Sequence, residues 1–185
     1  VDTIGISMYG NGGMNSDYPA VTGGASCPAP GMGMFCGGAF GNGKTGVNLQ
    51  QALLSIALAK AIGPVSIGVA PTLARQQIEI EGMQIFSGFS SSPTNVSNRG
   101  TDVSWGWGVR AGLEYAVMPG LRLGVAGSTP MWMQKFDRYR GIFAEQGDFD
   151  IPAFLQAGIA YDLTPALTMM FDYKHIWYSG IASIV

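Results

Sequence analysis

The stretch DVSWGWGVRAGLEYAV, residues 102–117, alternates between apolar residues and small or polar ones. One set of alternate positions is Val103, Trp105, Trp107, Val109, Ala111, Leu113 and Tyr115. The other set is Ser104, Gly106, Gly108, Arg110, Gly112 and Glu114. Successive side chains of a strand point to opposite faces, whereas a helix with a period of 3.6 would mix these residues. The stretch therefore predicts a β-strand with one apolar face.

The same alternation predicts six more strands along the chain. Their ranges are 2–9, 47–61, 65–80, 121–129, 151–162 and 167–178. Three connections are tight turns, near Gly63, Pro119 and Pro165, and three are long loops, at residues 10–46, 81–101 and 130–150. In an up-and-down meander, all the tight turns fall at one end of the sheet and all the long loops at the other. This asymmetry is typical of outer-membrane barrels.

The composition agrees with a strand-based membrane protein. Only 12% of the 185 residues are charged, whereas a soluble domain has about 25%. Hydrophobic residues make up 47%, which argues against disorder. The longest apolar run, residues 52–63, is too short for a membrane-spanning helix, which needs about 18 or more. We therefore expect an all-β, antiparallel, up-and-down transmembrane β-barrel.

Seven strands do not close a barrel of this kind. Single-chain bacterial barrels have even strand numbers, and an open sheet edge in lipid leaves backbone groups unpaired. We expect residues 1–185 to be one partial barrel domain, a segment of a larger protein. Assembly of several copies is the alternative.

Other functional signals are weak. Cys27 and Cys36 lie in a Gly- and Pro-rich stretch, where a disulfide closing a surface loop is expected and two free thiols are the alternative. The single histidine, His175, is distant, so no metal site is predicted. A net charge of −2 gives no basic patch for nucleic acid. Nucleophile and phosphate-loop motifs are absent, so we expect no enzyme activity and no cofactor.

Three stretches resemble a known family. They are GNGGMNSDYP (10–19), SPTNVSNRGTDVSWGWGVRAG (92–112) and FDRYRGIFAEQGDFDIP (136–152). They are similar to segments of the FadL/TodX family of bacterial outer-membrane transporters for long-chain fatty acids and other hydrophobic compounds. The resemblance implies a 14-stranded barrel, here lacking its N-terminal hatch and closing C-terminal strands. It also implies extracellular long loops, contact with outer-membrane lipid, and passive uptake with lateral exit.

The resemblance further implies a substrate groove between two of the long loops. The apolar residues of those loops are Met83, Ile85, Phe86 and Phe89 in one, and Met131, Trp132, Met133, Ile142 and Phe143 in the other. Methionine and aromatic side chains suit a variable hydrophobic ligand. Packing of the loops onto the barrel mouth is the alternative, and both can hold together.

Basic residues of the lumen are implied to hold a substrate carboxylate. Arg75, Arg110 and Arg122 are assigned to the non-apolar face as candidates, although for Arg110 a structural ion pair with Glu114 or Asp102 is the favoured role. The resemblance also places Gly10 at the strand kink that opens the wall, while the simpler alternative is the start of a loop. Two other functions stay open: a structural or adhesive surface barrel, and a diffusion porin for polar solutes.

Overall fold

The computed structural model describes residues 3–20, 39–40 and 43–184. Its strands are β1 (Thr3–Tyr18), β2 (Thr45–Ile62), β3 (Val65–Glu81), β4 (Asp102–Met118), β5 (Leu121–Ser128), β6 (Trp132–Met133), β7 (Phe154–Thr164) and β8 (Leu167–Ile176). The short helices are η1 (Gln84–Phe89), η2 (Pro93–Asn95), η3 (Asp137–Tyr139), α1 (Ala144–Gly147) and η4 (Tyr178–Gly180). No helix within these ranges is long and apolar enough to cross a membrane.

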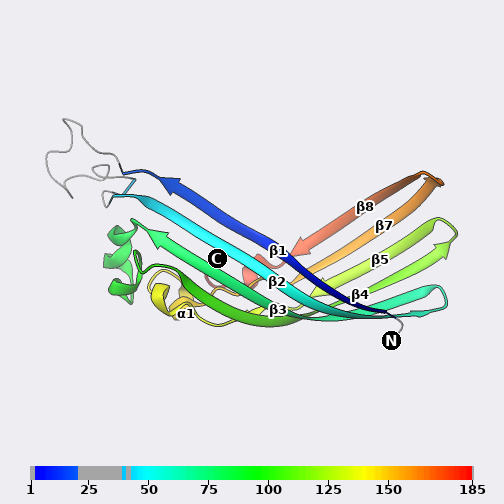
Figure 1. Cartoon of the computed structure of the whole chain (residues 1–185), viewed down its shortest axis with the longest axis horizontal. Helices are drawn as coiled ribbons and strands as arrows, with labels where there is room; N and C mark the ends of the chain where they lie inside the picture. Colours follow the sequence, from blue (N-terminus) through cyan, green and yellow to red (C-terminus); the bar gives the residue numbers. More distant parts are fainter. Residues whose placement is uncertain (1–2, 21–38, 41–42, 185) are drawn as a thin grey trace.

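The long strands form one antiparallel sheet in the order β1-β2-β3-β4-β5-β7-β8. Each strand pairs with its neighbour in the chain, and the short β6 pairs with β4 beyond the end of β5. Figure 1 shows the sheet curled into a trough, with the tight turns at one end and the long connections at the other. The predicted up-and-down sheet of seven strands is confirmed as a curled half-barrel.

The strand pairings define a concave and a convex face. On β4, Ser104, Gly106 and Gly108 are buried, whereas Trp105 and Trp107 are exposed. Arg110, on the same face as Ser104, reaches Tyr9 and Phe154 on strands that are not its neighbours. Only side chains on the inside of a curved sheet can meet in this way, so this face is the concave one.

The predicted orientation of Arg75 is wrong. Arg75 pairs with Trp105 and its guanidinium lies over that indole ring, so it is on the convex face and not on the small, polar one. Tyr9 pairs with the buried Leu53 and is on the concave face. For both residues the position in the alternation decides the orientation, and the chemical type of the side chain does not.

The first strand is longer than predicted. It continues through Gly10 to Tyr18, so the predicted loop 10–46 starts too early. The pairing with β2 shifts between Gly10 and Gly12, where one extra residue is inserted. Such a bulge changes which residues face inward. Met14 consequently pairs with Leu49 on the concave face.

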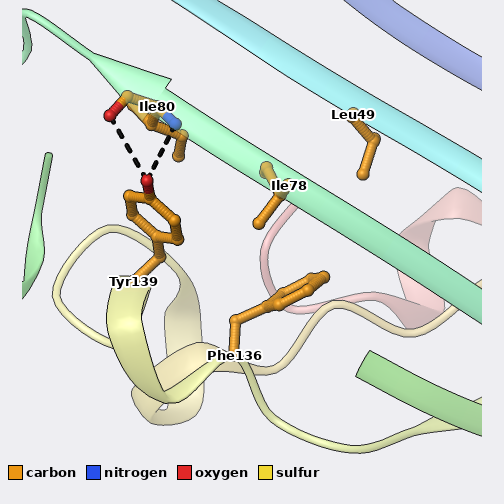
Figure 2. Packing of buried hydrophobic residues seen from close by; sticks show 5 residues of the cluster. All are labelled: Leu49, Ile78, Ile80, Phe136 and Tyr139. Atoms are coloured by element: carbon orange, nitrogen blue, oxygen red, sulfur yellow. Dashed lines mark hydrogen bonds between the residues drawn. The ribbon is translucent and has the colours of Figure 1, made fainter. Parts of the chain in front are cut away.

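The connections at the long-loop end are packed against the concave face. Phe136 and Tyr139 come from the connection between β5 and β7, and they bury Leu49, Ile78 and Ile80 (Figure 2). The Tyr139 hydroxyl group accepts a hydrogen bond from the Ile80 backbone N–H at 3.0 Å. It lies 2.6 Å from the Gly100 carbonyl oxygen, to which it donates. A hydroxyl group buried in an apolar cluster needs such partners, and they fix the connection in place.

A second cluster lies deeper in the trough. Leu53 and Ala74 of the sheet are covered by Met131 and Ile151, which pair with each other in an isolated bridge. The connection between β5 and β7 therefore contains strand pairing of its own and runs back across the concave face. It covers part of the sheet at the long-loop end of the trough.

Candidate functional site: a cleft on the concave face

A cleft lies on the concave face directly beneath the packed connection. Its apolar lining includes Met14, Leu49, Met131, Phe149, Ile151 and Ile176. Its polar lining includes Asn11, Gln51, Arg110, Ser128, Asp150 and Lys174. Binding sites for small molecules are mostly apolar with a few fixed polar groups, and this lining has that character.

Two cations and two aromatic rings meet at one side of the cleft. The Arg110 guanidinium donates to the Tyr9 hydroxyl group, and its carbon lies 5.2 Å from the Tyr9 ring centroid and 5.5 Å from that of Phe154. The Lys174 ammonium lies 4.2 Å from the centroid of the Phe154 ring. Cation–π contacts of this length are attractive, and they hold both cations at the cleft.

Within the described ranges, neither cation is neutralised by an acid. Among the described ion pairs, which involve Lys44 and Arg122, none includes Arg110 or Lys174. The Arg110 Nε atom is buried and has no hydrogen-bond partner in the described part of the chain. A buried donor without a partner costs free energy, so the site favours an acceptor, above all an anionic one.

A chain of amide side chains crosses the sheet beside these cations. Asn11 donates to Gln51 at 2.9 Å, Gln51 donates to Gln76 at 3.3 Å, and Gln76 donates to the Phe149 carbonyl oxygen at 2.9 Å. Gln76 is fully buried. The chain links the bulge of β1 to the connection that covers the cleft, so it orders the cleft wall.

Asp150 fixes another edge of the cleft. Its carboxylate accepts a hydrogen bond from the Met133 backbone N–H at 2.6 Å. Burial raises the pKa of Asp150 above its usual value, and the nearby carboxylates of Asp148 and Glu145 raise it further. The hydrogen bond from Met133 opposes this shift. Asp150 therefore holds the β6 segment and is not paired with either cation.

Towards the tight turns, the trough is lined mainly by small residues. They include Ala57, Ala59, Gly68, Gly112, Gly124, Ala126, Gly158 and Ala160. Arg122 lies here and forms an ion pair with Asp162 at 3.4 Å, so its charge is neutralised by a neighbouring strand of the sheet. This half of the trough offers space and few specific contacts.

The apolar loop residues predicted for a substrate groove do not lie together: some are in the two buried clusters, some are exposed, and one is on the convex face. Met83, Ile142 and Phe143 pack around the first buried cluster, and Met131 and Met133 belong to the second. Ile85, Phe86 and Phe89 of η1 are exposed, Phe89 at 92%. Trp132 packs against Trp107, with ring centroids 5.1 Å apart and ring planes tilted by 53°, and so lies with the convex-face aromatics.

The predicted ion pair of Arg110 is not formed. Asp102 accepts hydrogen bonds from the Val103 and Arg138 backbone N–H groups instead, and Glu114 lies four residues further along β4. Tyr9, Phe154 and Lys174 were not predicted as site residues. The alternation already puts Lys174 on the same face as Asp172, but the approach of distant strands depends on the curvature of the sheet.

The structure does not test the predicted disulfide or the predicted role of Gly10. Cys27 and Cys36 lie outside the described residues, so their disulfide stays a prediction. Across the described ranges, no three His, Cys, Asp or Glu side chains gather as a metal site would require. Gly10 lies within β1 beside the register shift, and its role in a wall opening stays a prediction.

The fold defines the class of this chain as a section of an up-and-down β-barrel, with its cleft on the inside. The toluene transporter TbuX of Ralstonia pickettii has a similar structure, with a TM-score of 0.63 and 16% sequence identity. The similarity covers 96% of this chain and 51% of TbuX, so the chain spans about half the length of that protein. TbuX is an outer-membrane transporter of the FadL family, and the predicted resemblance of fold is confirmed. No family model matches the sequence, and no curated protein matches it either.

Proposed function

We propose that this chain is part of an outer-membrane barrel of the FadL/TodX family that takes up hydrophobic compounds passively. The observation that carries this proposal is the cleft, which combines an apolar lining with the cations Arg110 and Lys174, neither of which forms an ion pair among the described residues. A long-chain fatty acid has the matching chemistry, because its tail is apolar and its carboxylate is an anion. The fold of the toluene transporter TbuX supports a hydrophobic substrate in general.

The exposed side chains of η1 fit the capture step of such a transporter. Ile85, Phe86 and Phe89 expose apolar surface on the connection between β3 and β4. Exposed apolar surface of this kind commonly marks a binding region. In this proposal they collect the substrate, the cleft receives it, and the β1 bulge near Gly10 provides a weak point for lateral exit.

Uptake of oleate and of toluene into liposomes separates the proposed roles. Liposomes carry the full-length protein, either unchanged or with Arg110→Gln. The carboxylate of oleate needs the guanidinium, so we expect Arg110→Gln to slow oleate uptake about tenfold and toluene uptake little, given about 1.5–3 kcal/mol for a charged hydrogen bond. Arg140→Gln, an exposed loop change outside the cleft, is the matched control.

The same assay tests the other two functions. Oleate uptake no faster with the protein than without it would contradict transport and favour a structural or adhesive barrel. Rapid uptake of glucose would indicate a diffusion porin. Phe86→Glu tests the capture surface separately, because it should weaken oleate uptake without changing the cleft.

A further inference from the structure

The convex face changes from apolar to polar at one row of paired residues. Going from the tight turns towards the long loops, the last fully apolar row of this face consists of Leu54, Leu73 and Trp107. In the next convex row towards the long loops, Arg75 stands between Ala52 and Trp105. The side chains in the rows beyond it on β2 and β3 are Gln50, Gln77, Asn48 and Glu79.

The polar side chains of these rows form a continuous hydrogen-bonded chain. Arg75 donates to Gln77 at 3.0 Å, Gln77 donates to Gln50 at 3.0 Å, and Gln50 donates to Asn48 at 3.2 Å. Thr101 donates to Glu79 at 3.1 Å one row further on. Exposed amides and carboxylates do not lie in hydrocarbon, because their desolvation is too costly. The hydrocarbon layer must therefore end near the row of Arg75.

The distance to the other end of the apolar surface agrees with this boundary. Arg75 pairs with Trp105, and Val65 pairs with Tyr115, so ten residues separate the two rows on both strands. At about 3.3 Å per residue and a tilt of about 40°, ten residues span about 25 Å along the membrane normal. That is the height of the apolar band of an outer-membrane barrel, and the aromatics Trp105 and Tyr115 stand at its two borders.

Arg75 is held at this border, and no acid of the described part of the chain neutralises its charge. Its guanidinium carbon lies 5.8 Å from the centroid of the Trp105 ring. Gln77, which is neutral, accepts from one Nη atom. The ion pairs of the described residues do not include Arg75. A guanidinium binds phosphate oxygens in bidentate fashion, and the phosphates of membrane lipids lie at this depth.

We propose that Arg75 and Trp105 form a binding site for the phosphate of a lipid headgroup, in the leaflet on the long-loop side. Arg75 contacts the phosphate, and the Trp105 ring orients the guanidinium and packs against the upper part of the acyl chain. The site rests on the proposed membrane barrel, but it is separate from the cleft. It would fix the height of the barrel in the bilayer.

Native mass spectrometry of the full-length protein in detergent tests the site with phosphatidylglycerol and with an uncharged galactolipid. We expect Arg75→Gln to weaken phosphatidylglycerol binding at least fivefold, Arg75→Lys to weaken it less, and both to leave galactolipid binding unchanged. Arg140→Gln is the matched control for loss of one arginine. Equal phosphatidylglycerol binding by Arg75→Gln and the unchanged protein would overturn the proposal. Binding of inorganic phosphate as tight as that of phosphatidylglycerol would also overturn it, because the membrane lipid would then contribute nothing beyond a free anion.

Spin labels separate failure of this site from failure of the membrane barrel itself. Labels on Leu73→Cys and Gln77→Cys in lipid vesicles should differ, with position 73 accessible to oxygen and position 77 to a water-soluble nickel complex. If both positions are accessible from water, the membrane barrel itself is contradicted. If the two positions differ as expected but Arg75→Gln binds lipid normally, only the phosphate site is contradicted.

Discussion

At the scale of single residues, the Tyr139 hydroxyl group links the covering connection to the sheet. It bonds the Ile80 N–H and the Gly100 carbonyl oxygen inside an otherwise apolar cluster. Tyr139→Phe leaves both backbone groups without this partner, so we expect a loss of about 1–3 kcal/mol in unfolding free energy. Urea unfolding monitored by tryptophan fluorescence measures it. Tyr161→Phe, on the convex face, is the control, and an equal loss there would contradict the assigned role.

Asp150 provides a prediction with a definite dependence on pH. Burial raises the pKa of its carboxyl group, so the folded protein holds the proton more tightly than the unfolded chain. Stability from this group is therefore present at low pH and decreases as the pH rises from the usual pKa of the group through its raised value. Asp150→Asn keeps an oxygen acceptor for the Met133 N–H without the charge. We expect this variant to lose that decrease when unfolding is followed between pH 3 and pH 8.

If instead Asp150→Asn shows the same pH dependence as the unchanged protein, the assignment of this dependence to Asp150 is contradicted.

Arg75 and Arg110 show how much of the side-chain orientation can be predicted from the sequence. Counting alternate positions places both correctly, but Arg75 was assigned by its charge to the polar face. A charge on the convex face is acceptable here because it lies at the border of the apolar band.

At the scale of elements, β4 accepts β6 only because Gly106 has no side chain. A Cβ atom there would collide with the Trp132 carbonyl oxygen and with Met133. We expect Gly106→Ala to displace β6 and cost about 1–3 kcal/mol, since overpacking forces the backbone to move. Limited proteolysis should then cut the connection 130–150 faster.

Gly124→Ala on β5 is the matched change, because a Cβ atom there lies 3.9 Å from the Leu113 carbonyl oxygen, an ordinary contact. Faster proteolysis in both variants would show that β6 is not the sensitive element. The pairing of β6 could not be predicted, since two residues give no alternation. The bulge of β1 was also missed, because the glycines at 10, 12 and 13 suggested a loop, and it reverses the orientation of Met14.

At the scale of the whole molecule, the alternation and the segregation of tight turns from long loops were sufficient to predict the sheet. Both are local consequences of a strand with one apolar side. The covering of the trough could not be predicted in the same way. Phe136 and Tyr139 look like ordinary loop residues in the sequence, and their burial depends on contacts with β2 and β3. The connection also contributes residues that line the cleft, so the lining of the cleft could not be predicted either.

The height of the apolar band gives a test of the whole arrangement in lipid. Val69 lies on the convex face near the middle of the band, and Gln77 lies on the same strand and face beyond its border. For folding of the full-length protein into lipid vesicles, Val69→Arg should cost about 2–4 kcal/mol and Gln77→Arg about 0–1 kcal/mol. On a sheet whose convex face meets water, both arginines would be nearly neutral. Equal costs, measured by urea titration in the same vesicles, would contradict the membrane position argued from Arg75 and Trp105.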